Sequence, residues 1–197
     1  MAKVKARAKK APAARTKVET SLHDSGWIHA QLEAFAREIL AQGNIERAMI
    51  VGIRRRGAEL ARRVCERVRG TSRLPVVYGA LDIGLYRDDS GRARPGSHGL
   101  KGGTDLEDAV DERVVYLIDD VIHTGRTIRA AIDQLMDFGR PSAIRLYSLI
   151  DRGARELPIQ PDRVAERLKV PAEDRIEVRL NEVDGVEGVY RVAGGMR

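Results

Sequence analysis

Apolar side chains recur along this chain in two alternating patterns, helical spacing and short continuous runs. Between residues 26 and 42 they repeat every three or four positions, which predicts a helix. Residues 47–53 form a short apolar run that is typical of a buried strand. A turn at 54–57 then leads into a second helical pattern that continues to about residue 69. This alternation of strand and helix predicts an α/β fold.

The second half of the chain continues the alternation. Its predicted elements are strands at 75–85, 114–118, 143–150 and 175–180 and a helix at 127–138. A polar, glycine-rich segment at 86–108 interrupts the series, and loops of that length in compact domains are usually functional or disordered. We therefore expect one domain with a mostly parallel central sheet flanked by helices, without internal repeats.

The positive charge of the chain is concentrated at its beginning. The formal net charge is +6, and residues 1–18 contain seven Lys and Arg residues and no acidic residue. The remainder carries 28 basic and 29 acidic residues, so it is close to neutral. We predict that residues 1–20 form a disordered basic tail and that residues 21–197 form the folded domain. Contact of the tail with nucleic acid or another polyanion is an alternative.

The number of cysteines and the length of the apolar runs indicate where in the cell the protein is expected. The chain has one cysteine, Cys65, which lies within a helical pattern and excludes an internal disulfide. No apolar run approaches the roughly 20 residues that cross a bilayer, and no apolar stretch follows the first charges. We expect a buried Cys65 and a cytoplasmic protein without membrane contact.

The segment VVYLIDDVIHTGRT, residues 114–127, carries the most specific chemistry. An apolar strand ends in the carboxylates of Asp119 and Asp120, and a Thr-Gly-Arg-Thr turn then opens a helix. A helix N-terminus presents free N–H groups and a favourable dipole to an anion, and Gly125 permits close approach. Adjacent carboxylates accept hydrogen bonds from a sugar diol. The segment therefore predicts a ribose 5-phosphate site, and it lacks the spacing of a Walker loop.

This segment closely resembles the signature of type I phosphoribosyltransferases, which bind phosphoribosyl pyrophosphate (PRPP). Five further segments, in the same order, are similar to the PyrR family of pyrimidine operon attenuators and uracil phosphoribosyltransferases: VGIRRRG at 51–57, LDI at 81–83, LYRDD at 85–89, DRGARELPI at 151–159 and NEVDG at 181–185. The resemblance implies the type I phosphoribosyltransferase fold, with a flexible loop over the active site and a small C-terminal hood. It also implies transfer of the phosphoribosyl group of PRPP to uracil, with Mg²⁺ as cofactor and UMP and pyrophosphate as products.

The resemblance assigns roles to individual residues. Asp119, Asp120 and Arg87 are the implied catalytic residues, and the two aspartates are implied to hold Mg²⁺, mostly through water and PRPP. The PRPP-binding residues that it implies are Arg55, Arg56, Gly57, Asp119, Asp120, Val121, His123, Thr124, Gly125, Arg126 and Thr127. The flexible loop is implied to begin at Arg87, Asp88 and Asp89.

The base site is where this chain departs from the pattern of the family. The implied base-binding residues are Arg152, Arg163 and Val164. Arg163 stands where relatives place an aromatic or apolar side chain over the base, and Ala165-Glu166 replaces Gly-Lys. A guanidinium can stack on a base, but an altered base specificity, or a role in sensing PRPP alone, is an alternative to uracil transfer.

RNA and further copies of the chain are the implied macromolecular partners. An RNA-binding attenuator that senses uridine nucleotides is the second functional alternative, and a homodimer or homotetramer is the implied assembly. The positions that match the basic RNA-binding face read Glu33, Ala154-Arg155, Gln160 and Glu166. Because several cations are missing and acids replace them, we predict weak binding of this face to RNA phosphates.

Overall fold

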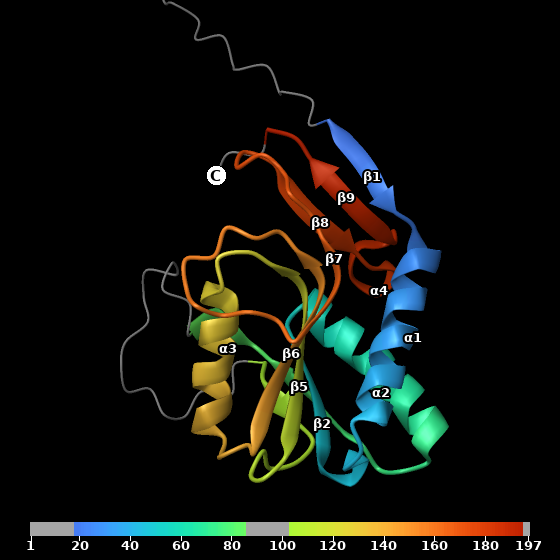
Figure 1. Cartoon of the computed structure of the whole chain (residues 1–197), viewed down its shortest axis with the longest axis vertical. Helices are drawn as coiled ribbons and strands as arrows, with labels where there is room; N and C mark the ends of the chain where they lie inside the picture. Colours follow the sequence, from blue (N-terminus) through green and yellow to red (C-terminus); the bar gives the residue numbers. More distant parts are fainter. Residues whose placement is uncertain (1–17, 86–102, 195–197) are drawn as a thin grey trace, which may run out of the picture.

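Two layers of helices enclose a six-stranded sheet, and a second, smaller sheet lies beyond one end of it (Figure 1). The computed structural model describes residues 18–85 and 103–194. The strands of the large sheet are β2 (Ala48–Ile53), β3 (Val77–Leu81), β4 (Asp105–Leu106), β5 (Val114–Ile122), β6 (Ala143–Asp151) and β7 (Arg163–Arg167). Their order is β4-β3-β2-β5-β6-β7, and each neighbouring pair is parallel except β3 and β4. The carboxyl ends of β2, β5 and β6 therefore meet at one edge.

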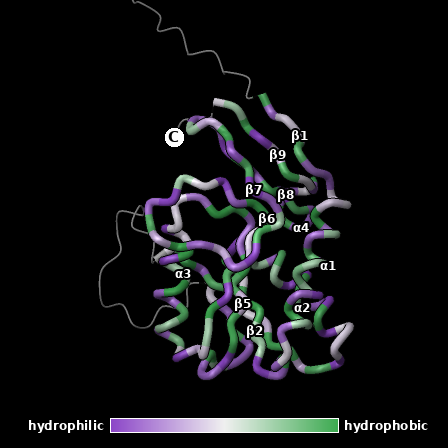
Figure 2. The backbone as a smooth tube through the Cα atoms, viewed as in Figure 1, coloured by the Kyte–Doolittle hydropathy of each residue, from purple (hydrophilic) through white to green (hydrophobic). Residues whose placement is uncertain are grey.

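Helices cover both faces of this sheet. Helices α1 (Ser25–Ala41) and α2 (Arg56–Ser72) lie on one face and α3 (Arg126–Asp137) on the other, while two 3-10 turns occupy Ile45–Arg47 and Ile83–Leu85. Each face buries its own aliphatic cluster, one built around Phe35, Ile50 and Ile118, the other around Met49, Leu117 and Leu135. The inner strands β2 and β5 are accordingly apolar along most of their length (Figure 2).

The smaller sheet forms a hood above the carboxyl edge of the large one. It consists of β1 (Glu19–His23), β9 (Gly188–Val192) and β8 (Arg175–Arg179), antiparallel and in that order, with the short helix α4 (Asn181–Asp184) between β8 and β9. Both ends of the described chain thus contribute to the hood, since Glu19 is paired with Val192.

A buried arginine of the core forms ion pairs with the hood. Arg63 of α2 is 7% exposed and contacts three carboxylates, those of Glu59 on its own helix and of Glu182 and Glu187 in the hood. The Arg63 Nη1–Glu187 Oε1 distance is 2.7 Å. The guanidinium lowers the pKa of Glu182 to about 2, because the hydrogen bond between them favours the carboxylate. A buried charge that is paired on several sides holds its neighbours in one arrangement.

The fold confirms the α/β expectation and the long elements, and it corrects several boundaries. The strand expected at 114–118 continues to Ile122, so the aspartate pair lies within β5 rather than after it. The strand expected at 175–180 is not the last, because β9 follows it. Glu19 and Thr20, which we assigned to the basic tail, are paired in β1, and residues 1–17 lie outside the described residues.

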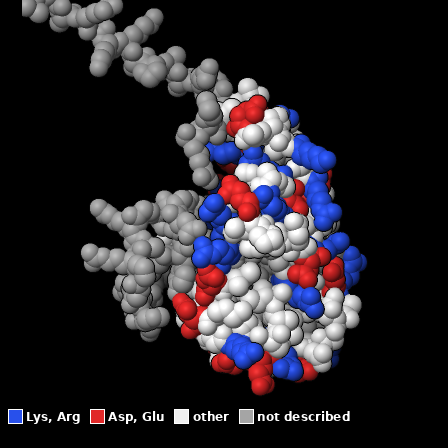
Figure 3. Space-filling view, turned by 60° about the vertical axis from the view of Figure 1, so that its left-hand side comes forward, with Lys and Arg blue, Asp and Glu red and all other residues white. Residues whose placement is uncertain are grey.

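Two further expectations concern the surface and the core. Cys65 is 1% exposed, as expected, and burial raises the pKa of its thiol to about 11. Basic and acidic side chains are interspersed on the face shown in Figure 3, in keeping with the near-neutral composition outside the tail. Across the described residues, no helix is both long enough and apolar enough to cross a membrane.

Candidate active site

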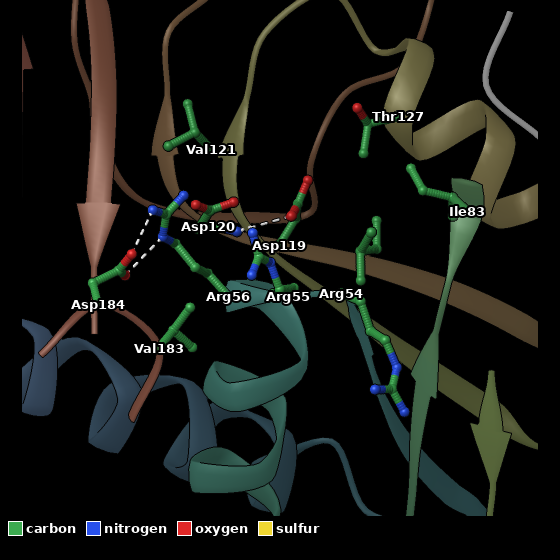
Figure 4. A pocket seen from close by; sticks show the side chains of 11 residues that line it. Arg54, Arg55, Arg56, Ile83, Asp119, Asp120, Val121, Thr127, Val183 and Asp184 are labelled. Carbon is green, nitrogen blue, oxygen red and sulfur yellow. Dashed lines mark hydrogen bonds and ion pairs between the residues drawn. The ribbon is translucent and has the colours of Figure 1, made fainter. Parts of the chain in front are cut away.

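A polar pocket of about 350 Å³ opens between the carboxyl edge of the large sheet and the hood (Figure 4). Its walls come from the ends of β2 and β5, the first turns of α2 and α3, the 3-10 turn at Ile83–Leu85, and helix α4 of the hood. The residues that line it are Ile53, Arg54, Arg55, Arg56, Ile83, Asp119, Asp120, Val121, Thr127, Val183 and Asp184. Three arginines and three aspartates thus surround a single space.

The aspartate pair lies at the back of this pocket, near the carboxyl end of β5. Asp119 is 5% exposed, and its Oδ1 accepts a hydrogen bond from the Asp120 N–H at 3.0 Å. Burial, and then the neighbouring Asp120 carboxylate, raise the pKa of Asp119 well above its ordinary value. Burial also raises the pKa of Asp120, but the Asp119 hydrogen bond and the Arg56 guanidinium oppose that shift. A bound cation or a hydroxyl-bearing ligand would stabilise both carboxylates.

Two glycines bring the first turn of α2 against this strand end. A Cβ on Gly52 would lie 2.2 Å from the carbonyl oxygen of Gly57 and 2.4 Å from the Cα of Ala58. A Cβ on Gly57 would lie 2.7 Å from the carbonyl oxygen of Ile118 and 3.2 Å from Asp119 Oδ1. Only glycine fits at either position, because the nearest atoms belong to the backbone.

The arginine turn faces the hood across the pocket. The Arg54–Arg55 peptide bond is cis, and α2 begins at the next residue. The Arg56 guanidinium donates two hydrogen bonds to Asp184, from Nε at 2.9 Å and from Nη2 at 2.7 Å. This bidentate pair raises the pKa of Arg56 and lowers that of Asp184, because each group favours the charged form of the other. The pair links the core and the hood directly.

The turn between β5 and α3 forms the remaining wall. Gly125 precedes the first residue of α3 with a φ of 92°, a left-handed conformation that favours glycine. Thr127 lines the pocket, and the Thr124 hydroxyl oxygen accepts a hydrogen bond from the Arg126 N–H at 3.3 Å. The first N–H groups of a helix have no partner within the helix, so this turn can bind an anion.

Comparison with known proteins agrees with this arrangement. The family model "Phosphoribosyl transferase domain" matches residues 19–174. A "Bifunctional protein PyrR" of Roseiflexus sp. (strain RS-1) is 45% identical over 176 residues, which cover 88% of this chain and 95% of that protein. The protein of the same name from Acetivibrio thermocellus is 39% identical over 172 residues, which cover 87% of this chain and 92% of that protein. The chain belongs to the PyrR family of phosphoribosyltransferases.

Solved structures show the same fold at low sequence identity. A hypoxanthine phosphoribosyltransferase of Staphylococcus aureus superposes with a TM-score of 0.60 at 15% identity, covering 90% of this chain and 92% of that one. A hypoxanthine-guanine phosphoribosyltransferase of Bacillus anthracis gives 0.60 at 14% identity, covering 90% and 98%. The type I phosphoribosyltransferase fold expected from the sequence is therefore confirmed.

In this PyrR-family chain, many of the residues expected to bind PRPP meet in one pocket. Those that line it are Arg55, Arg56, Asp119, Asp120, Val121 and Thr127. Gly57 packs behind the aspartates, whereas His123, Thr124, Gly125 and Arg126 form the adjoining turn. The side chain of Arg126 pairs with Glu156, with Nε 2.6 Å from Oε2. Binding of a phosphate by Arg126 stays a prediction, because its backbone N–H donates to the Thr124 hydroxyl in this structure.

The residues expected at the base are not among those that line the pocket. Arg163 and Val164 lie on β7, and Arg163 Nε is 3.2 Å from Glu38 Oε2 of α1. The Arg152 guanidinium donates to the carbonyl oxygen of Ala172 at 2.9 Å and lies 3.4 Å from His123 Nδ1. Base binding by these three residues stays a prediction. Arg87, Asp88 and Asp89 lie outside the described residues.

Sequence reasoning missed the contribution of the hood to the pocket. Val183 and Asp184 line it, yet they were noted only as part of the segment NEVDG that the PyrR family shares. The one available signal was that short acidic motif near the end of the chain. Arg56, which pairs with Asp184, lies 128 residues earlier, so no local pattern connects the two residues.

The pocket offers a divalent cation a partial set of ligands. Asp119 and Asp120 supply carboxylate oxygens, which suit a hard cation such as Mg²⁺. Within the residues that the structure describes, no group of three or more His, Cys, Asp or Glu side chains could hold a metal ion. Magnesium fits this chemistry, because it commonly takes one or two carboxylates and completes its shell with water and substrate phosphates.

Proposed function

We propose that this chain is a uracil phosphoribosyltransferase, which converts uracil and PRPP to UMP and pyrophosphate. The observation that carries the proposal is the convergence of three anion- and sugar-binding elements on one pocket. These elements are the arginine turn at 54–57, the Asp119–Asp120 pair and the N-terminus of α3. The fold and the PyrR family membership supply the reaction class.

Each element has a part of PRPP to hold. Arg55 and Arg56, with the N–H groups of their turn, would bind the diphosphate, because guanidinium groups pair with phosphate oxygens in a bidentate manner. The turn at 124–127 would bind the 5-phosphate through free N–H groups and hydroxyls. Asp119 and Asp120 would accept hydrogen bonds from the ribose hydroxyls between these two ends.

The reaction is a displacement at the anomeric carbon of the ribose. The bond from that carbon to the diphosphate oxygen breaks, and its electron pair leaves with pyrophosphate. A ring nitrogen of uracil forms the new bond and loses its proton to solvent. The aspartate pair and the arginines would stabilise the positive ring and the departing diphosphate, respectively. The hood would exclude water, and Arg87, outside the described residues, is the further catalytic residue that we propose.

Magnesium would be held by Asp119 and Asp120 together with oxygens of PRPP and water. When bound, it supplies positive charge that offsets the diphosphate. We also propose, from the family resemblance, a homodimer or homotetramer, and a cytoplasmic location in keeping with the lone buried Cys65.

RNA binding is the second candidate function, since the relatives named above are called bifunctional and the chain begins with a run of cations. The side chain of Arg155, which matches the expected RNA-binding face, is only 12% exposed and is paired with Asp151. We therefore place regulation by RNA below catalysis, and the basic tail is the part of the chain best suited to that partner.

Turnover with a panel of bases tests the proposal. With PRPP and magnesium present, we expect kcat/KM for uracil to exceed that for cytosine, hypoxanthine or guanine by about 100-fold, since unpaired polar groups penalise the wrong base. Liquid chromatography of the nucleotide products measures this, with reactions lacking PRPP as the control. Faster turnover of a purine base, or no nucleotide product from any base, would contradict the assignment.

A further inference from the structure

Residues 155–157 donate hydrogen bonds to two carbonyl oxygens of the turn between β5 and α3. The His123 carbonyl oxygen accepts a hydrogen bond from Arg155 Nη1 at 2.7 Å. The Thr124 carbonyl oxygen accepts two, from the Glu156 N–H at 2.9 Å and the Leu157 N–H at 3.2 Å. Both oxygens of the turn therefore point toward this segment.

This arrangement decides where the N–H groups of the turn point. The cis peptide recorded in the described chain is elsewhere, so the His123–Thr124 and Thr124–Gly125 peptides are trans. In a trans peptide, the C=O of one residue and the N–H of the next point in opposite directions. The N–H groups of Thr124 and Gly125 therefore point away from 155–157. Among the described residues, neither donates to an acceptor.

Arg155 is itself fixed within a nearly closed environment. Its Nη2 lies 2.8 Å from Asp151 Oδ1, and its Nε donates to the Ile159 carbonyl oxygen at 2.9 Å. Asp151 is 6% exposed and also accepts the Gly153 N–H at 2.8 Å. Asp151 offsets the charge of the Arg155 guanidinium. Arg155 therefore acts on the turn by fixing the position of its carbonyl group and not by attracting the phosphate.

We propose that Arg155 is a positioning residue for the 5-phosphate turn. It joins the end of β6 to the His123 carbonyl and so keeps the carbonyl oxygens of the turn away from the phosphate and the N–H groups toward it. This inference rests on the proposed function, which assigns the 5-phosphate to residues 124–127. It also gives Arg155 a role within the fold rather than on an RNA-binding surface.

The test separates the two phosphate sites. In the full-length protein with magnesium, Arg155→Met should weaken UMP binding about tenfold, the value of one hydrogen bond of roughly 1.4 kcal/mol to a charged group. Pyrophosphate, which lacks a 5-phosphate and uses the arginine turn, should bind within twofold of the wild-type affinity. Calorimetric titration measures both. The matched control is Arg167→Met, since Arg167 Nε also approaches Asp151, at 3.7 Å, but the side chain is 75% exposed.

Arg155→Lys serves as the second variant, because it keeps the charge near Asp151 but lacks the fork that donates to both the His123 and Ile159 carbonyl oxygens. It should show the same selective loss, smaller in size. Unchanged UMP binding in both variants would overturn the inference, and so would equal losses of UMP and pyrophosphate, which indicate a general structural role. Wild-type protein that binds pyrophosphate but not UMP would instead overturn the proposed 5-phosphate site.

Discussion

Asp119→Asn is expected to lower phosphoribosyl transfer by about 100-fold and, at the same time, to make the ligand-free protein more stable. The loss of activity follows because asparagine brings neither the charge nor the second acceptor that a carboxylate offers to ribose hydroxyls and magnesium, and single contacts of this kind contribute about 100-fold. Asp120→Asn should lose activity to a similar extent. In Asp119→Asn the amide oxygen of the new side chain can still accept the Asp120 N–H, so the fold should be retained.

The gain in stability follows from the raised pKa of Asp119. A folded-state pKa above the unfolded value means that the native protein holds a proton that the unfolded chain has already released. The free energy of unfolding therefore falls as pH rises from the ordinary pKa of aspartate to the raised one, and the penalty is complete above it. Asparagine does not ionise, so the difference between variant and wild type should grow with pH and then level off.

Calorimetric unfolding between pH 4 and pH 8 and initial rates at neutral pH measure the two effects. A gain of 1 kcal/mol corresponds to about 2–4 °C in Tm for a domain of this size. Asp108→Asn is the control, because Asp108 lies outside the pocket and its pKa is lowered by the Ala109 N–H and Arg113. That variant should keep its activity and gain no stability. Wild-type turnover by Asp119→Asn would show that Asp119 has no part in the active site.

Gly52→Ala is expected to destabilise the protein by about 3 kcal/mol and to weaken PRPP binding at least tenfold. The added methyl group would lie 2.2 Å from the Gly57 carbonyl oxygen and 2.4 Å from the Ala58 Cα. Because these are backbone atoms, the first turn of α2 has to shift, and overpacking of this kind costs about 1–3 kcal/mol or more. The shift moves Arg56 and Gly57 relative to Asp119, and misplacement by about 1 Å can cost 100-fold in rate.

Gly70→Ala is the matched control for this substitution. Gly70 lies in the same helix, α2, and a Cβ there meets nothing within 4 Å. Alanine should stabilise the helix by about 0.5–1 kcal/mol, since glycine loses more backbone freedom on folding. Urea unfolding and PRPP titration of both variants check the pair. If Gly52→Ala matched Gly70→Ala in both measurements, the close packing of α2 against β2 would not hold in solution.

The inner elements of the fold could be predicted from the sequence because their side chains are apolar at a regular spacing. Strands β2 and β5 are continuous apolar runs, whereas α1 and α3 carry apolar residues on one side. Strands β1 and β7 were not predicted. Both are short edge strands with few apolar residues, and β1 also pairs with a distant segment, as between Glu19 and Val192. Local pattern contains no information on such partners.

Only the part of the candidate site that is contiguous in the sequence could be predicted. The carboxylates of Asp119 and Asp120 and the turn that follows them are contiguous, so their order alone indicated the chemistry. The Arg56–Asp184 pair and the Arg155 contacts with the turn depend on tertiary structure. Arg155 shows the difference most clearly, since it occupies a position that matches the RNA-binding face of the family, whereas its side chain is 12% exposed.

Calorimetric titration of PRPP into the protein, with magnesium and then with a chelator, tests whether this pocket is a magnesium-dependent PRPP site. We predict one PRPP site per chain, with binding at least tenfold tighter in the presence of magnesium, and loss of that magnesium effect in Asp119→Asn. Equal affinity with and without magnesium, or PRPP binding that Asp119→Asn leaves unchanged, would contradict the assignment of this pocket.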